Sequence, residues 1–177
     1  MPEFAVTAIG RDRPGIAAAI SGALLELGGN IEDSQMSILR GQFAVVLIVS
    51  LADPLDRAAV EDRLERVRTE LSLEAVTLDA IDDPGAATAR PSHVIRVHGA
   101  DHPGIVHAVA SALAERGVNI TGLETRVAGA ADSRIYVMIM EVALAGASED
   151  EVASVLDAVG EGSGVEVSIG PLDAEAL

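Results

Sequence analysis

Apolar residues recur along this chain with two different spacings, one typical of strands and one typical of helices. Near its start they occupy every second position, which is typical of a strand with one buried face, at Phe4, Val6 and Ala8. The following stretch carries apolar residues at helical spacing, which predicts an amphipathic helix, at Ile16, Ile20, Ala23, Leu24 and Leu27. The pattern therefore predicts a strand followed by a helix.

Two more strands and a second helix complete this first pattern. The strands are predicted at 31–39 and 43–51, joined by a tight turn in which Gly41 tolerates a positive φ. The second helix follows Asp53 as its cap and Pro54 as its first residue. Its apolar face consists of Val60, Leu64, Val67 and Leu71. A last alternating strand then contains Val76, Leu78 and Ala80.

The same order of predicted elements occurs a second time in the sequence. The segment Asp12-Arg13-Pro14-Gly15-Ile16 returns 89 positions later as Asp101-His102-Pro103-Gly104-Ile105. Gly28-Gly29-Asn30-Ile31 returns at the same offset as Gly117-Val118-Asn119-Ile120. A duplication that preserves both letters and spacing indicates two copies of one structural unit.

The second copy repeats each element of the first. A strand around Ile95 and Val97 precedes the helix of Ile105, Val109, Ala112 and Leu113. The hairpin connection at 128–133 is about three residues longer than its counterpart, an insertion that costs little. The second helix opens with a capping box from Ser148 to Glu151. A last strand contains Val165, Val167 and Ile169.

The order strand, helix, strand, strand, helix, strand predicts an α+β fold, with two ferredoxin-like repeats whose antiparallel sheets carry both helices on one face. We expect repeat 1 at 1–82, a linker at 83–91, repeat 2 at 92–172 and a tail at 173–177. Each repeat is small for independent stability, so the two are expected to pack together or to pair with another chain.

Composition narrows the range of functions. The chain has 28 acidic and 12 basic residues, a net charge of −16, and only three aromatic residues. Direct binding to nucleic acid or to an anionic membrane is therefore disfavoured. The absence of cysteine excludes disulfides and thiolate chemistry. Glu3 stands where a signal peptide needs basic residues, so we expect a cytoplasmic protein.

The repeated loop between strand and helix is suited to bind a zwitterion. Proline can occupy an early helical position, and glycine leaves the neighbouring N–H groups open to a carboxylate. Asp12 and Asp101 are placed either to cap the helix or to face an ammonium group. Asn30 and Asn119 follow the helix with amides that donate and accept. Taken singly, each residue is equally typical of a cap or a turn.

The two signatures resemble the ACT domain, a regulatory module whose members bind amino acids at interfaces between domains. The resemblance covers nearly the whole chain as two copies and is similar to the glycine cleavage system transcriptional repressor family, which acts through protein contacts with a DNA-binding activator. It implies ligand contacts in the first copy from Asp12, Arg13, Pro14, Gly15, Ile16, Asn30 and Ile31. In the second copy it implies them from Asp101, His102, Pro103, Gly104, Ile105, Asn119 and Ile120.

Other chemistry finds little support. His98, His102 and His107 match no metal-binding spacing, and Gly160–Gly164 follows a helix, where a phosphate loop would precede one. No nucleophile, base and oxyanion donor can be assembled, so no catalytic residue, metal or cofactor is expected.

We expect a non-enzymatic regulator that binds a small amino acid and a protein partner, with indirect control of transcription in glycine metabolism and a homo-oligomeric state. The alternatives are an interaction or oligomerisation module without a ligand and, less favoured, a small enzyme.

Overall fold

The computed structural model describes residues 2–51, 56–81, 89–129 and 134–172. The chain divides into two compact units, Met1–Ala86 and Ala87–Leu177. Most of the predicted linker, the tail at 173–177, and the predicted cap at Asp53 and Pro54 lie outside the described residues.

Unit 1 has the predicted order of elements. Its bounds are β1 Glu3–Arg11, α1 Ile16–Glu26, β2 Asn30–Leu39, β3 Gln42–Ser50, α2 Arg57–Glu70 and β4 Ala75–Ala80. The β2–β3 turn consists of Arg40 at φ 50° and Gly41 at φ 80°, so both of its residues are left-handed, as a two-residue hairpin prefers.

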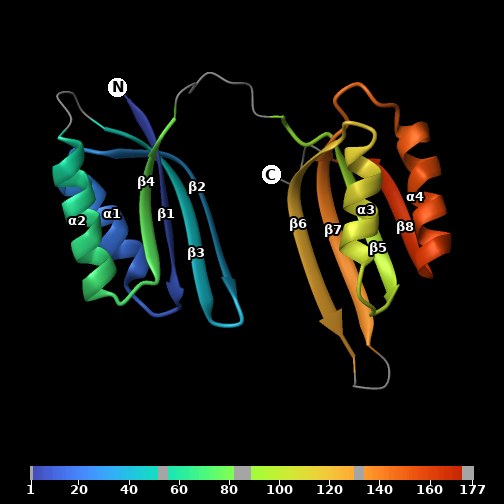
Figure 1. Cartoon of the computed structure of the whole chain (residues 1–177), viewed down its shortest axis with the longest axis horizontal. Helices are drawn as coiled ribbons and strands as arrows, with labels where there is room; N and C mark the ends of the chain where they lie inside the picture. Colours follow the sequence, from blue (N-terminus) through green and yellow to red (C-terminus); the bar gives the residue numbers. More distant parts are fainter. Residues whose placement is uncertain (1, 52–55, 82–88, 130–133, 173–177) are drawn as a thin grey trace. The chain divides into compact units, whose positions relative to one another are not determined.

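Unit 2 repeats that order. Its bounds are β5 His93–Ala100, α3 Ile105–Ala114, β6 Asn119–Ala128, β7 Ile135–Ala143, α4 Glu149–Ser163 and β8 Val165–Pro171. Two tandem ferredoxin-like units are thus confirmed, each with both helices on one face of its sheet (Figure 1).

The two antiparallel sheets have equivalent strand orders, β2-β3-β1-β4 and β6-β7-β5-β8. Most residues of the predicted apolar faces are buried, with Val6 and Ile95 fully covered, whereas Ala80, predicted on the apolar face of a strand, is exposed at the end of β4. Each unit has its own apolar core, because the alternating strand faces and the helical stripes meet between sheet and helices. These cores hold the β1–α1 and β5–α3 loops in equivalent positions.

The described starts of the second helices differ from each other. Helix α2 begins at Arg57, and the side chain of Asp56 caps it by accepting from the Ala59 N–H at 3.2 Å. Helix α4 has the predicted capping box, in which Ser148 accepts from the Glu151 N–H at 3.3 Å. Helix α4 also runs through the glycine-rich segment and ends at Ser163, with Gly164 as its left-handed C-cap, so that segment is helical for most of its length.

Candidate functional site

The loop before α1 contains one residue in the left-handed region, Gly15, directly before the helix. Gly15 is the N-cap of α1, at φ 97°, and Pro14 lies before it, so the prediction of an early helical position for the proline is wrong. A Cβ at Gly15 would meet no atom within 4 Å. The glycine is therefore required by its backbone conformation, which other residues adopt at a cost, and the space around it is open.

The second copy has the same geometry. Gly104 caps α3 at φ 101°, again with open space around it. Neither α1 nor α3 has a side chain hydrogen-bonded at its cap or an acidic residue in its first turn. Asp12 and Asp101 thus do not cap these helices. The two beginnings offer N–H groups and the positive end of the helix dipole to an incoming anion.

Asp12 and Asp101 are exposed beside these helix beginnings. The Asp12 N–H donates to the carbonyl oxygen of Gly41 at 2.8 Å, which fixes the loop against the hairpin tip while the carboxylate stays outside. In unit 2, burial raises the pKa of Tyr136, and the charge of Asp101 raises it further.

Arg13 and His102 contact the protein itself. An Arg13 guanidinium N–H donates to the Glu70 carbonyl oxygen at 3.2 Å, at the last residue of α2. Nε2 of His102 lies 2.6 Å from the Ser163 carbonyl oxygen, at the last residue of α4. Both side chains link their loop to an unpaired carbonyl at the end of the second helix. The resemblance had placed them on a ligand, and the structure gives them this structural contact.

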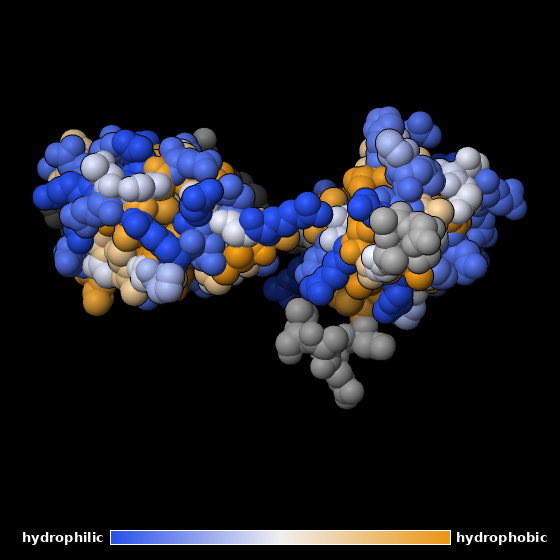
Figure 2. All heavy atoms as spheres, turned by 90° about the horizontal axis from the view of Figure 1, so that it is seen from below, coloured by the Kyte–Doolittle hydropathy of each residue, from blue (hydrophilic) through white to orange (hydrophobic). Residues whose placement is uncertain are grey.

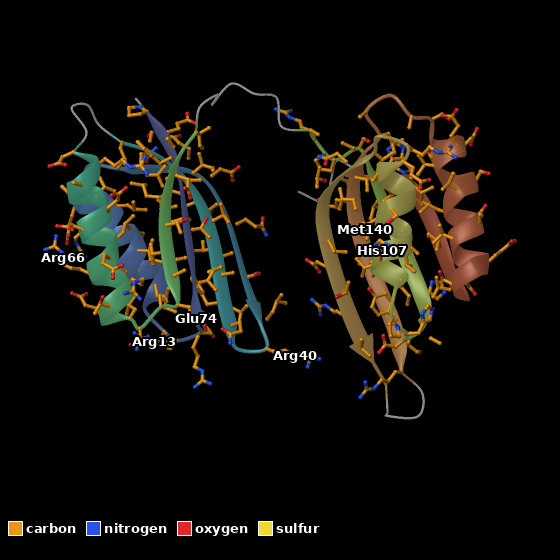
Figure 3. All side chains as sticks on the ribbon, viewed as in Figure 1. Arg13, Arg40, Arg66, Glu74, His107 and Met140 are labelled. Carbon is orange, nitrogen blue, oxygen red and sulfur yellow. The ribbon has the colours of Figure 1, made fainter. Side chains whose placement is uncertain are left out.

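Asn30 and Asn119 lie at the opposite end of each sheet from the loops. Asn30 pairs with Ser50 across the sheet. The loop follows Arg11, which pairs with Gln42 beside the hairpin tip at the other end. In Figure 1, β1 ends at the lower edge of unit 1 while β2 begins at the upper edge, and Figure 3 shows Arg13 at the lower end. Unit 2 repeats this arrangement. The two halves of each signature are therefore not brought together within one unit.

The two asparagines have different surroundings. Nδ2 of Asn30 donates to Glu32 at 2.9 Å, and the Ser50 hydroxyl donates to the same carboxylate oxygen at 2.7 Å. These two hydrogen bonds, that of Ser50 being the stronger, lower the pKa of Glu32. Asn119 is level with Ala143, which has no hydroxyl, and within the described residues its side chain makes no hydrogen bond. The amide of the second copy is thus the more available.

The isoleucines of the signatures are mostly structural. Ile16 and Ile105 are fully buried in the cores, where they anchor the first turns of α1 and α3. Ile120 is half-buried against the core of unit 2. Ile31 is partly exposed and lines a groove of about 300 Å³ between α1 and β2, together with Ala17, Ala18, Ile20, Ser21, Ser34, Met36, Phe43, Val45 and Leu47.

Two glycines near the loops, Gly10 and Gly99, are closely packed in a way that the sequence analysis does not predict. A Cβ on Gly10 would lie 2.8 Å from a Leu73 methyl, and one on Gly99 would lie 2.8 Å from a Val165 methyl. These glycines let the chain that enters the last strand pack closely against β1 or β5. They are also 89 positions apart, so the repeat itself contains the signal.

The histidines singled out in the sequence have separate partners in the described structure. His98 pairs with Glu166 at 3.0 Å on the exposed sheet face, and His107 lies on α3, 3.4 Å from the Ser111 hydroxyl. No group of three candidate ligands is found within the described residues. No helix among them is long and apolar enough to cross a membrane.

Comparison with known proteins identifies the repeated unit. Models of the ACT domain match residues 3–81 and 93–161. The glycine cleavage system transcriptional repressor of Escherichia coli K12 is 26% identical over 143 residues, which cover 77% of this chain and 71% of that protein. A UPF0237 protein of Methanopyrus kandleri is 38% identical over 77 residues, covering 43% of this chain and 86% of that protein.

Solved structures match along nearly the full length. An unknown protein from Galdieria sulphuraria has a TM-score of 0.83 at 30% identity, covering 97% of this chain and 98% of that chain. A candidate glycine cleavage system transcriptional repressor shares the fold, with a TM-score of 0.75 at 19% identity and 97% of each chain covered. This chain therefore belongs to the ACT-domain family and consists of two ACT domains in tandem.

Proposed function

We propose that this protein is a non-enzymatic regulator that binds a small amino acid at its signature loops and thereby changes its affinity for a protein partner. The observation that carries the proposal is the pair of helix beginnings at Gly15 and Gly104, each without a side-chain cap and each beside an exposed aspartate. A ligand carboxylate suits the helix N–H groups, and a ligand ammonium suits the Asp12 or Asp101 carboxylate.

The loop and the asparagine of each signature lie too far apart for one small amino acid to contact both. Helix α1 has 11 residues and separates the loop from Asn30, so it alone spans about 16 Å. A small amino acid cannot contact both ends of one ACT unit. A ligand of one unit therefore uses either the loop or the asparagine. Its binding changes affinity for a partner when it favours one conformation of the protein over another.

The second copy is the stronger candidate for the asparagine contact. Its Asn119 amide makes no side-chain hydrogen bond within the described residues, whereas the Asn30 amide is held by Glu32. A ligand at Asn30 has to compete with that internal carboxylate for the same donor. We therefore expect the site that uses Asn119 to have the higher affinity.

The relationship to the Escherichia coli repressor suggests what the regulated process is. That protein is named for transcriptional repression of the glycine cleavage system. The net charge of −16 opposes direct contact with DNA, so we expect control through a protein partner and glycine or a similarly small amino acid as the signal.

A melting-temperature screen of the intact chain against the twenty amino acids tests the proposal. A ligand that binds only the folded state raises the melting temperature. Calorimetric titration of Asp12→Asn, Asp101→Asn and the matched control Asp62→Asn, on the exposed face of α2, then locates the site. Unchanged affinity in both loop variants contradicts a role for these carboxylates.

An interaction module without a ligand is the second candidate, and exposure of all ten β2 residues favours it. An uncovered edge strand is a template for pairing with another chain. This alternative predicts assembly that is indifferent to every amino acid in the screen.

A further inference from the structure

The histidines of this chain are confined to unit 2. There are four of them, at positions 93, 98, 102 and 107, and the sequence of unit 1 contains none. Histidine is the side chain that ordinarily gains or loses its charge between about pH 5 and about pH 8. Effects of pH in that range are therefore expected mainly in unit 2, and unit 1 provides an internal reference.

One of these histidines, His102, has a carbonyl oxygen at each ring nitrogen. Nε2 lies 2.6 Å from the Ser163 oxygen, and Nδ1 lies 3.1 Å from the Pro103 oxygen. A carbonyl oxygen only accepts hydrogen bonds, and a neutral imidazole has one N–H group to donate, whereas the imidazolium has two. Both contacts are therefore hydrogen bonds only when the ring carries its positive charge.

The end of α4 favours that charge. Ser163 is the last residue of the helix. The carbonyl groups of a last helical turn lack intrahelical partners and form the negative end of the helix dipole. The last turn of α4 has no basic residue of its own. The protonated ring of His102 thus supplies, from another part of the chain, the cation that this helix end lacks.

The charged side chains of the surrounding elements are mostly acidic. Asp101 precedes His102 in the loop, and its charge adds to the effect of burial in raising the pKa of Tyr136 on β7. A hollow of about 580 Å³ beside the end of α4 is lined by three carboxylates from α4 and β8, Asp157, Glu161 and Glu166. His98 of β5 lines the same hollow and pairs with Glu166 at 3.0 Å. These carboxylates favour the positive form of His102.

Unit 1 has an arginine at the equivalent place. Arg13 precedes Pro14 and Gly15 as His102 precedes its own proline and glycine. Its guanidinium donates to the carbonyl oxygen of Glu70, the last residue of α2, at 3.2 Å. Arginine keeps its charge over the whole range in which histidine titrates. Both repeats thus link the loop to the end of the second helix, and only the link in unit 2 can lose its charge.

We propose that His102 is a positioning residue that holds the second signature loop against α4 when it is protonated and loosens it as the pH rises, while Arg13 holds the first loop at either pH. When the ring loses one proton, one of its two carbonyl partners loses its donor and the helix end loses its cation. Figure 2 looks onto the lower side of Figure 1, where the loops lie, and shows hydrophilic residues, in blue, over much of each unit.

The consequence for ligand binding rests on the proposed function. The loop leads directly into α3 through Gly104, whose carbonyl oxygen accepts from the Ala108 N–H at 2.9 Å. A loosened loop leaves the N–H groups at this helix beginning less ordered, and an anion that must order them binds less tightly. The second site is therefore expected to weaken as the pH rises, and the first site is expected to be unaffected.

Hydrogen exchange of the full-length protein without any ligand tests the link. After correction for intrinsic rates, protection of amides 108–112 in α3 is expected to fall by about fivefold from about pH 5 to about pH 8, while amides 19–23 in α1 keep theirs. His102→Arg abolishes the decline in α3. Arg13→His introduces a decline in α1, where no other histidine is present. His98→Ala is the matched control and leaves the decline in α3 unchanged.

Three results overturn the proposal: equal pH dependence in α1 and α3 of the wild type, an unchanged decline in His102→Arg, or loss of the decline in His98→Ala. Calorimetric titration with glycine at the same two pH values tests the consequence for binding. Weaker binding at the higher pH in the wild type but not in His102→Arg supports it, and equal affinities contradict it. Glycine that binds at neither pH contradicts the proposed function, whereas the hydrogen-exchange result still decides the role of His102.

Discussion

Nε2 of His102 lies 2.6 Å from the carbonyl oxygen of Ser163, the last residue of α4. The other ring nitrogen of His102, Nδ1, lies 3.1 Å from the carbonyl oxygen of Pro103. Arg13 makes the corresponding contact with Glu70 in unit 1. A different side chain in each copy thus holds the signature loop against the end of the second helix.

Loss of this contact is expected to loosen unit 2 locally. His102→Ala removes one hydrogen bond and lowers the free energy of unfolding by about 1 kcal/mol. Hydrogen exchange of the amides of residues 108–112, the first that are hydrogen-bonded in α3, accelerates in the same variant, while His102→Arg, which copies the residue of unit 1, retains protection. His98→Ala on the open sheet face is the control. Equal exchange in His102→Ala and the wild type contradicts the role of the contact.

Substitution of either cap glycine is expected to lower the free energy of unfolding, and the cause is the backbone conformation alone. Gly15→Ala and Gly104→Ala meet no atom within 4 Å but force alanine to φ near 100°, which costs about 1–3 kcal/mol. Gly22→Ala, inside α1 and equally free of neighbours, is the matched control and stabilises by about 0.5–1 kcal/mol. Urea unfolding measures all three. Equal effects at Gly15 and Gly22 refute the conformational explanation.

Glu32 links the start of β2 to Ser50 and contributes a pH dependence. Hydrogen bonds lower its pKa in the folded state, so its carboxylate stabilises that state above the usual glutamate range of about 4.3. This stabilisation is lost as the pH falls through the lower folded value. NMR titration of the Glu32 carboxyl carbon is expected to show a midpoint below the usual range, and Ser50→Ala moves it upward. An identical midpoint in both proteins rules out the Ser50 contribution.

Release of Asn30 from Glu32 is expected to strengthen ligand binding at the first copy. Glu32→Gln removes the negative charge that holds the Asn30 amide at 2.9 Å, and the amide becomes more available. Calorimetry with the amino acid found in the melting-temperature screen measures the change. Glu61→Gln, exposed on α2, is the control. A weaker affinity in Glu32→Gln indicates that the carboxylate itself belongs to the site.

The sequence predicts the fold well because the two periodicities are uninterrupted and duplicated. The buried positions Phe4, Val6 and Ile20 follow directly from spacing, and the strand order follows from the element order. The cap of α1 was less predictable. Pro14-Gly15 is compatible with a helical proline, and only the backbone shows that the left-handed Gly15 separates the proline from the helix.

The candidate site was predicted as a set of residues but not as an arrangement. Spacing along the chain does not reveal that α1 carries Asn30 to the far end of the sheet from Asp12. Nor does a family signature distinguish a side chain that faces a ligand from one that faces its own protein. Arg13 and His102 have the latter contact because carbonyls at the ends of α2 and α4 lie within reach.

The central claim is that the two uncapped helix beginnings recognise a zwitterion. The most direct measurement is a ¹⁵N NMR titration of the full chain with the amino acid that raises its melting temperature. We predict concentration-dependent shifts at the amides of Gly15 and Ile16, of Gly104 and Ile105, or of both pairs. Shifts confined to other residues, or none at saturating amino acid, would contradict the claim.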